Sequence, residues 1–108
     1  MNVSGKVQQI LAELRRRFEA LYGERLKHLV LYGSQARGDA EPGSDIDVLV
    51  VLAGPVSACD EIARTIDDVA EISLHNNEVV CCVFVSQEQF ERERSPLLLN
   101  VRREGIAV

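Results

Sequence analysis

Apolar residues recur every three or four positions through the first twenty residues of the chain. This spacing places them on one face of an α-helix. The apolar positions of this face are Val7, Ile10, Leu11, Leu14, Phe18 and Leu21. We therefore expect an amphipathic first helix, with the run Arg15-Arg16-Arg17 on its solvated side.

Three short apolar runs farther along the chain predict β-strands at residues 26–32, 46–52 and 79–85. Each run is bounded by turn-forming glycine, proline, serine or asparagine residues. The run 46–52 is almost wholly aliphatic after Asp47, which is typical of a strand covered on both faces. The sequence thus predicts a small sheet with a deeply buried member.

The segments between and after these runs predict helices. Residues 34–38 can form one or two helical turns, and 39–44 has the chemistry of a loop. Residues 56–74 form a longer pattern, in which we expect these apolar residues to face inward: Ile62, Ile66, Val69 and Ile72. The expected outward residues are Asp60, Glu61, Arg64, Asp67 and Asp68.

Two helix starts are predicted near the end of the chain. Ser86 and Gln89 have the spacing of a capping box, and Val85 and Phe90 that of a hydrophobic staple. A second start at Ser95-Pro96 leads to a natural stop at Gly105. Between these points, Leu97-Leu98-Leu99 is either core or a contact surface for a partner.

Length and composition limit the classes of protein. The chain has 108 residues, 46% hydrophobic and 27% charged, which suits one folded domain over residues 1–108. No apolar run approaches the ~20 residues that span a bilayer, and the N-terminus has no signal-peptide pattern. We expect a cytoplasmic protein without a membrane partner. The net charge of −5 argues against strong nucleic-acid binding.

The three cysteines, Cys59, Cys81 and Cys82, show neither a disulfide framework nor zinc-site spacing. We expect them to be reduced. Cys81 and Cys82 are neighbours in a predicted strand and should point to opposite faces as small buried hydrophobes.

Two carboxylates open the second predicted strand. Asp45 and Asp47 are two residues apart, so their side chains should point the same way. Like charges this close repel each other, and a bound divalent cation commonly offsets this repulsion. Mg²⁺ in particular binds one or two carboxylates together with substrate phosphates and water. This pair therefore predicts a metal site for Mg²⁺ or Mn²⁺.

A phosphate site is predicted just upstream. Gly33 permits a sharp turn after the first strand, and Ser34 opens the short helix, whose first amides attract anions. Arg37 lies in the same turn and can add a positive charge beside a triphosphate. Gly38 lets the loop double back toward the two carboxylates.

These residues together resemble a known family. Gly33-Ser34, Ala36-Arg37-Gly38 and Ser44-Asp45-x-Asp47 are similar to the motif of the minimal nucleotidyltransferases of the DNA polymerase beta superfamily. The resemblance implies a single-domain α/β (α+β) nucleotidyltransferase fold, a small mixed sheet flanked by helices. It also implies ATP or another nucleoside triphosphate as donor, with the metals on Asp45 and Asp47. The residues expected on the nucleotide are Gly33, Ser34, Arg37 and Ser44.

One departure from the family pattern concerns a third acid. The family usually carries it on a later strand, where it helps to bind the second metal and to deprotonate the acceptor hydroxyl. Here only Glu78 is available, at the edge of the predicted strand 79–85. Glu78 is either a third catalytic carboxylate or a solvated charge.

Two functions follow from these expectations. The first is transfer of a nucleoside monophosphate, most simply AMP, to a hydroxyl of a protein or other acceptor. The resemblance also implies a helical HEPN partner in a toxin–antitoxin pair, and the small chain favours recognition across a partner or an oligomer. The second is a regulatory module that keeps the nucleotide site and acts by binding a partner. A P-loop enzyme is excluded because the chain has no G-x-x-x-x-G-K-[ST] motif.

Overall fold

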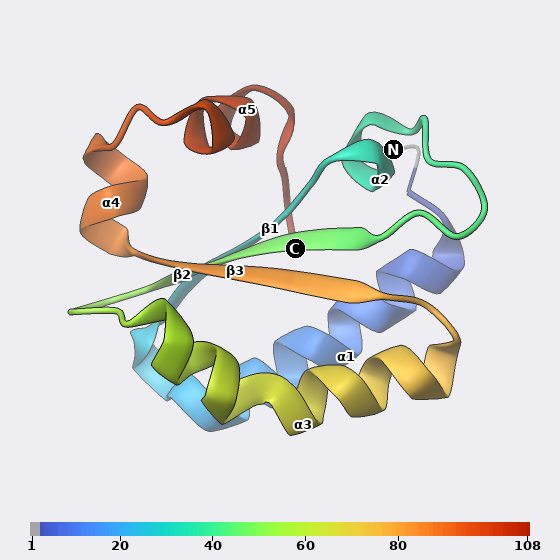
Figure 1. Cartoon of the computed structure of the whole chain (residues 1–108), viewed down its shortest axis with the longest axis horizontal. Helices are drawn as coiled ribbons and strands as arrows, with labels where there is room; N and C mark the ends of the chain where they lie inside the picture. Colours follow the sequence, from blue (N-terminus) through green and yellow to red (C-terminus); the bar gives the residue numbers. More distant parts are fainter. Residues whose placement is uncertain (1–2) are drawn as a thin grey trace.

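A four-stranded mixed sheet forms the middle layer of the molecule (Figure 1). The structure is a computed structural model and describes residues 3–108. The strand order is β3-β2-β1-β4; β1 is antiparallel to β2 and β4, and β2 is parallel to β3. The strands are β1 (Leu26–Tyr32), β2 (Ile46–Leu52), β3 (Val80–Ser86) and β4 (Ile106–Ala107). The expected mixed sheet flanked by helices is confirmed.

Helices cover both faces of this sheet. The long helices α1 (Gly5–Tyr22) and α3 (Ala58–Asn76) lie together on one face (Figure 1). Three shorter helices lie on the other face: α2 (Ser34–Arg37), α4 (Gln87–Arg92) and α5 (Pro96–Glu104). A single 3₁₀ turn, η1 (Gly23–Arg25), joins α1 to β1.

Two apolar cores hold the layers together. Even-numbered residues of β2 pack toward α1 and α3, whereas Leu49 and Val51 pack toward α4 and α5. Every residue of β2 except Asp47 is 0% exposed. This strand is therefore covered on both faces, as its aliphatic sequence predicted.

Several local predictions are confirmed. β1 and β2 have the predicted bounds, and β3 is displaced by one residue. The capping box of Ser86 and Gln89 is complete, with both of its hydrogen bonds formed. Ser95 caps α5, and Gly105 ends it. The 3₁₀ turn and the two-residue β4 were not predicted, because neither is long enough to show a periodic pattern.

The predicted inward face of α3 is confirmed at Val69 and Ile72, which pack in the core, and is wrong at Ile62 and Ile66. Ile62 and Ile66 are 46% and 54% exposed, whereas Glu61 and Thr65 are 4% and 1% exposed. Glu61 tolerates burial because its carboxylate accepts a hydrogen bond from the Tyr22 hydroxyl at 2.7 Å. Partners in α1 thus rotate α3 away from the orientation that hydrophobicity alone favours.

Smaller differences concern other apolar residues. Leu21 is 41% exposed, and the neighbouring Tyr22 is buried in its place. In α5, Leu98 belongs to the core, whereas Leu99 is 45% exposed. Among residues 3–108, no helix combines the length and the apolar character needed to cross a membrane.

Candidate nucleotide and metal site

The two predicted metal ligands, Asp45 and Asp47, lie just before β2 and at its second residue. Asp47 is the second residue of the strand and lies on the same face as Leu49 and Val51, toward α2, α4 and α5. Asp45 precedes the strand and is exposed, whereas Asp47 is partly buried. Alternation along the extended chain directs both carboxylates to this face.

Gly33 lies directly against Asp47. Residue 32 pairs with Asp47 in the β1–β2 register, so the turn after β1 meets the start of β2. A Cβ atom at Gly33 would lie 2.6 Å from Oδ2 of Asp47. Gly33 also has a φ of 76°, which only glycine adopts without strain. The glycine therefore brings the Gly33-Ser34 turn and the Asp47 carboxylate together.

The electrostatics of Asp47 show the repulsion that the sequence predicted. Burial and the nearby Asp45 carboxylate raise the pKa of Asp47 above its ordinary value, while Arg37 opposes this change. A positive charge placed between the two aspartates would relieve both effects.

Arg37 and Ser44, both predicted to contact the nucleotide, have protein partners in the structure. The Arg37 guanidinium pairs with Asp39 at 3.2 Å and with Glu104 at 3.1 Å. The Ser44 hydroxyl accepts a hydrogen bond from the Glu41 N–H at 3.0 Å. Arg37 thus ties the loop after α2 to α5, and Ser44 closes the loop ahead of β2.

Ser34 occupies the first position of α2. The Gly33 carbonyl accepts the N–H groups of Ala36 and Arg37. The amides of Ser34 and Gln35 are the first two of the helix and have no acceptor within it. The roles predicted for Gly33, Ser34, Arg37 and Ser44 stay predictions.

The predicted third acid, Glu78, lies in the turn before β3. Its carboxylate pairs with Lys6 of α1 at 3.3 Å. In the described chain, no hydrogen bond or ion pair connects Glu78 with the residues at the start of β2. Its catalytic role is untested, and Lys6 gives the side chain a structural role.

Two residues that were not among the predicted site residues lie beside Asp47. Tyr32 and Cys81 are its cross-strand neighbours in β1 and β3. The Cys81 thiol donates a hydrogen bond to Oδ2 of Asp45 over 3.6 Å, and burial, followed by Asp45, raises the pKa of this thiol. Cys81 was expected to be a buried hydrophobe, and the structure instead places it at the site. Only the strand register could have revealed this position.

The carboxylates of Asp45 and Asp47 could bind a divalent metal only if the nucleotide and water supplied the other ligands. Among residues 3–108, no group of three or more His, Cys, Asp and Glu side chains is arranged to hold a metal ion. Asp45 and Asp47 supply two carboxylates. Mg²⁺ commonly accepts such a pair when phosphate oxygens and water complete its shell, so these residues fit a metal that binds together with a nucleotide.

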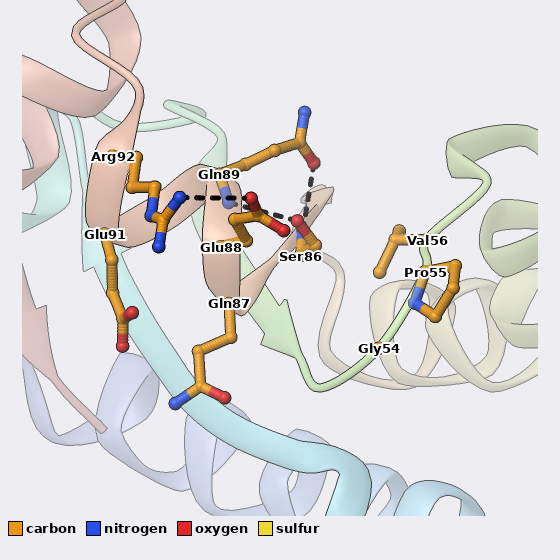
Figure 2. A pocket seen from close by; sticks show the side chains of 9 residues that line it. All are labelled: Gly54, Pro55, Val56, Ser86, Gln87, Glu88, Gln89, Glu91 and Arg92. Atoms are coloured by element: carbon orange, nitrogen blue, oxygen red, sulfur yellow. Dashed lines mark hydrogen bonds and ion pairs between the residues drawn. The ribbon is translucent and has the colours of Figure 1, made fainter.

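A separate hollow of about 850 Å³ lies at the opposite end of β2 and β3 (Figure 2). Gly54-Pro55-Val56 form one wall, and Ser86 with α4 forms the other. The capping hydrogen bonds and the ion pair of Glu88 and Arg92 already join several of its polar groups. It contains none of the predicted site residues.

Comparison with known proteins agrees with the geometry. Residues 8–104 match the model of the nucleotidyltransferase domain. The chain belongs to the nucleotidyltransferase family. It is also 30% identical, over 91% of its length and 93% of the other protein, to a predicted protein adenylyltransferase of Methanocaldococcus jannaschii.

Solved structures share the nucleotidyltransferase fold. One is a toxin–antitoxin complex with AMP-PNP, similar with a TM-score of 0.60 and 20% identity over 86% of this chain and 68% of the other. Another is a tri-AMPylated HEPN toxin of Shewanella oneidensis in complex with its MNT antitoxin. For that structure the TM-score is 0.53, with 21% identity over 94% of this nucleotidyltransferase and 67% of the other chain.

Proposed function

We propose that this nucleotidyltransferase transfers AMP from metal-bound ATP to a hydroxyl of a protein acceptor. The observation that carries the proposal is the contact of the Asp47 carboxylate with the Gly33-Ser34 turn, beside Asp45. A glycine that leaves no room for a side chain and two repelling carboxylates have little structural benefit, but together they suit a metal triphosphate.

The chain contributes mainly positioning to this reaction. The first amides of α2 and the Ser34 hydroxyl orient the phosphates, and Asp45 and Asp47 hold the divalent metal, Mg²⁺ or Mn²⁺. When bound, such a metal neutralises charge on the attacking and leaving oxygens of the displacement. The acceptor hydroxyl attacks the α-phosphorus and gives up its proton to a base or to water, the bond between the α-phosphorus and the β-phosphate oxygen breaks, and pyrophosphate leaves.

The acceptor is proposed to be a HEPN-type partner protein. The support is the likeness in fold to MNT antitoxins, one of them in complex with an AMPylated HEPN toxin, and the likeness in sequence to a predicted protein adenylyltransferase. The chain would then act as the antitoxin that modifies its partner.

A second candidate function is regulation by binding without transfer. One observation favours it: Cys81, and not an acid, lies in β3 in register with Asp47. A chain without a third carboxylate would bind the nucleotide and a partner but leave the acceptor hydroxyl protonated.

The deciding experiment incubates the protein with Mg²⁺ and ATP that is labelled at its α-phosphate, together with a HEPN protein or a lysate of the source organism. It measures how much label becomes attached to the acceptor protein. We expect wild type to transfer label. In the Asp45→Asn and Asp47→Asn variants the rate of transfer should fall roughly 100-fold or more, because the metal supplies several kcal/mol of charge stabilisation. Asp67→Asn, an exposed change in α3, is the matched control and should transfer label normally.

The same samples separate the two functions. A chelator should abolish transfer by wild type. Tight binding of MgATP without any transfer of label would contradict the enzymatic proposal and support the regulatory one.

A further inference from the structure

The outer edge of β3 is an uncovered strand edge. β3 pairs with β2 on one side only and is the last strand of the sheet. In Figure 1 it lies nearest the viewer, with α3 below it. Its seven residues, VCCVFVS, carry no charge and no proline. Natural edge strands usually contain such residues, because an apolar edge without them pairs readily with another strand.

The register shows which backbone groups face outward. The Ile46 N–H donates to the Val79 carbonyl at 2.8 Å, and Ile46 pairs with Val80. In a parallel pair, alternate residues direct both backbone groups to the neighbouring strand. The even-numbered residues of β3 therefore point away from β2.

Side chains already cap the two ends of this outward row. The Val80 N–H donates to the Ser73 hydroxyl at 3.2 Å, and the Ser86 N–H donates to the Gln89 side chain at 3.0 Å. The middle of the row, formed by Cys82 and Phe84, has no neighbouring strand in the described chain.

The flank of α3 beside this edge is also apolar. Because Ser73 reaches the outward N–H of Val80, the side of α3 that carries Ser73 faces the open edge of β3. Ile62 and Ile66 lie on the same side at helical spacing, 46% and 54% exposed. The residues of this flank are all uncharged: Cys59, Ile62, Ala63, Ile66, Val69, Ala70 and Ser73.

The charged residues of α3 lie elsewhere on the helix. Glu61, Asp68 and Glu71 contact side chains of α1. The uncharged flank and the open edge of β3 thus form one continuous strip, which we call the β3–α3 strip.

We propose that the β3–α3 strip binds a second copy of this chain, with the two β3 strands antiparallel about a twofold axis at Val83. Cys82 of each copy then lies opposite Phe84 of the other, and each pair exchanges two backbone hydrogen bonds. This inference does not depend on nucleotide transfer.

The positions along the strip agree with this axis. Val83 lies about 10 Å beyond Val80 along the strand, and Ile66 lies about 10 Å before Ser73 along the antiparallel helix. Since Ser73 and Val80 are in contact, Ile66 and Val83 are level with each other. One twofold axis therefore places Ile66 against Ile66 and Val83 against Val83 of the two copies.

A second copy covers the whole strip, whereas an isolated peptide strand would cover only its edge. α3 has 19 residues, about 28 Å, and the strand and helix layers together are roughly 15–20 Å deep. Pairing would then bury roughly 500 Å² per copy, close to the lower limit of about 1,000 Å² in total for a specific interface.

The first test measures molecular mass by light scattering and by sedimentation over a concentration series. We expect a reversible dimer whose dissociation constant rises ~10-fold or more in Ile66→Glu, because two charges meet on the axis. The matched control is Leu74→Glu. Leu74 belongs to the same helix and is 83% exposed, and helical spacing turns it about 80° from Ile66, past the outer margin of the strip, so this variant should dimerise like wild type.

The second test is a cross-link at the axis. Directly opposed residues that do not share hydrogen bonds have Cα atoms about 4.5 Å apart, within disulfide range. In a Cys59→Ser background, Val83→Cys should give a covalent dimer on mild oxidation. The same background with Val83 retained should not, because neither Cys81 nor Cys82 would lie opposite itself.

Either of two results overturns the proposal. One is that the protein is a monomer at every concentration and that Val83→Cys gives no covalent dimer. The β3–α3 strip would then bind a different protein and not a second copy. The other is a dimer that Ile66→Glu and Leu74→Glu affect equally, which would place the contact elsewhere.

Discussion

Asp47 is a residue whose charge the fold disfavours. Burial and Asp45 raise its pKa, so the folded state holds the Asp47 proton more tightly than the unfolded state does. Stability is therefore lost as pH rises from the ordinary carboxyl range through the raised pKa. At neutral pH without metal, ionised Asp47 destabilises the chain.

A substitution of Asp47 that removes this charge should stabilise the metal-free protein. In a chelator at pH 7, we expect Asp47→Asn to raise the free energy of unfolding by up to about 1 kcal/mol, a modest gain because solvent screens the partly exposed group. The gain should shrink below about pH 4, where wild-type Asp47 is protonated in both states. Thermal melts of Asp47→Asn and wild type at pH 7 and below about pH 4 measure the difference in stability. An equal difference at both pH values would contradict the electrostatic explanation.

Gly33 is the second residue on which the site depends. Gly33→Ala should cost about 2–3 kcal/mol of stability through its strained backbone and a Cβ atom placed 2.6 Å from Asp47. It should also remove any stabilisation by Mg²⁺ and ATP, because Asp47 must move. Chemical denaturation with and without these ligands measures both effects.

Gly43 provides the matched control for that substitution. It has a φ of 86°, but a Cβ atom there would meet nothing within 4 Å. Gly43→Ala should therefore show backbone strain only and keep the response to ligand. An equal loss of the ligand response in both variants would contradict the role given to Gly33.

The packing of α3 on α1 depends on polar contacts as well as on apolar burial. Glu61 accepts hydrogen bonds from the Tyr22 hydroxyl and, at 2.9 Å, from Arg64. Arg17 of α1 pairs with Asp68 and Glu71 of α3 and with Glu13 of its own helix. These contacts fix the helix rotation that leaves Ile62 and Ile66 beside the edge of β3.

Removing the Glu61 side chain should weaken the packing of α3 on α1. We expect Glu61→Ala to cost about 2–3 kcal/mol, because the Tyr22 hydroxyl would be buried without an acceptor. Glu61→Gln keeps an acceptor oxygen and should cost about 1 kcal/mol or less. Urea denaturation measures the difference, with exposed Asp67→Ala as the control; equal costs for the two Glu61 variants would contradict this account.

At the scale of the molecule, the sheet order gives β3 two roles. Its site-facing residue Cys81 adjoins Asp45 and Asp47, while its outer edge forms the proposed dimer contact. Antiparallel pairing about the Val83 axis would make one continuous sheet of eight strands with both nucleotide sites on the same face. A partner that carries two acceptor groups could then engage both sites at once.

The sequence by itself determined the local structure and the central motif. The bounds of β1 and β2, the capping box at Ser86 and the stop at Gly105 follow from residues that are close neighbours in the chain. The Asp45–Asp47 pair follows in the same way, because strand periodicity alone directs two residues to one face. Such features depend on interactions over a few residues, which a single sequence displays directly.

Only the tertiary structure decided which distant residues meet. The neighbours Tyr32 and Cys81 of Asp47, the contact of Gly33 with Asp47, and the pairing of Glu78 with Lys6 all depend on strand register and helix placement. The rotation of α3 depends on hydrogen bonds and ion pairs to residues 39 to 54 positions away. These contacts arise from the summed packing of the whole chain, so no local pattern of hydrophobic and polar residues specifies them.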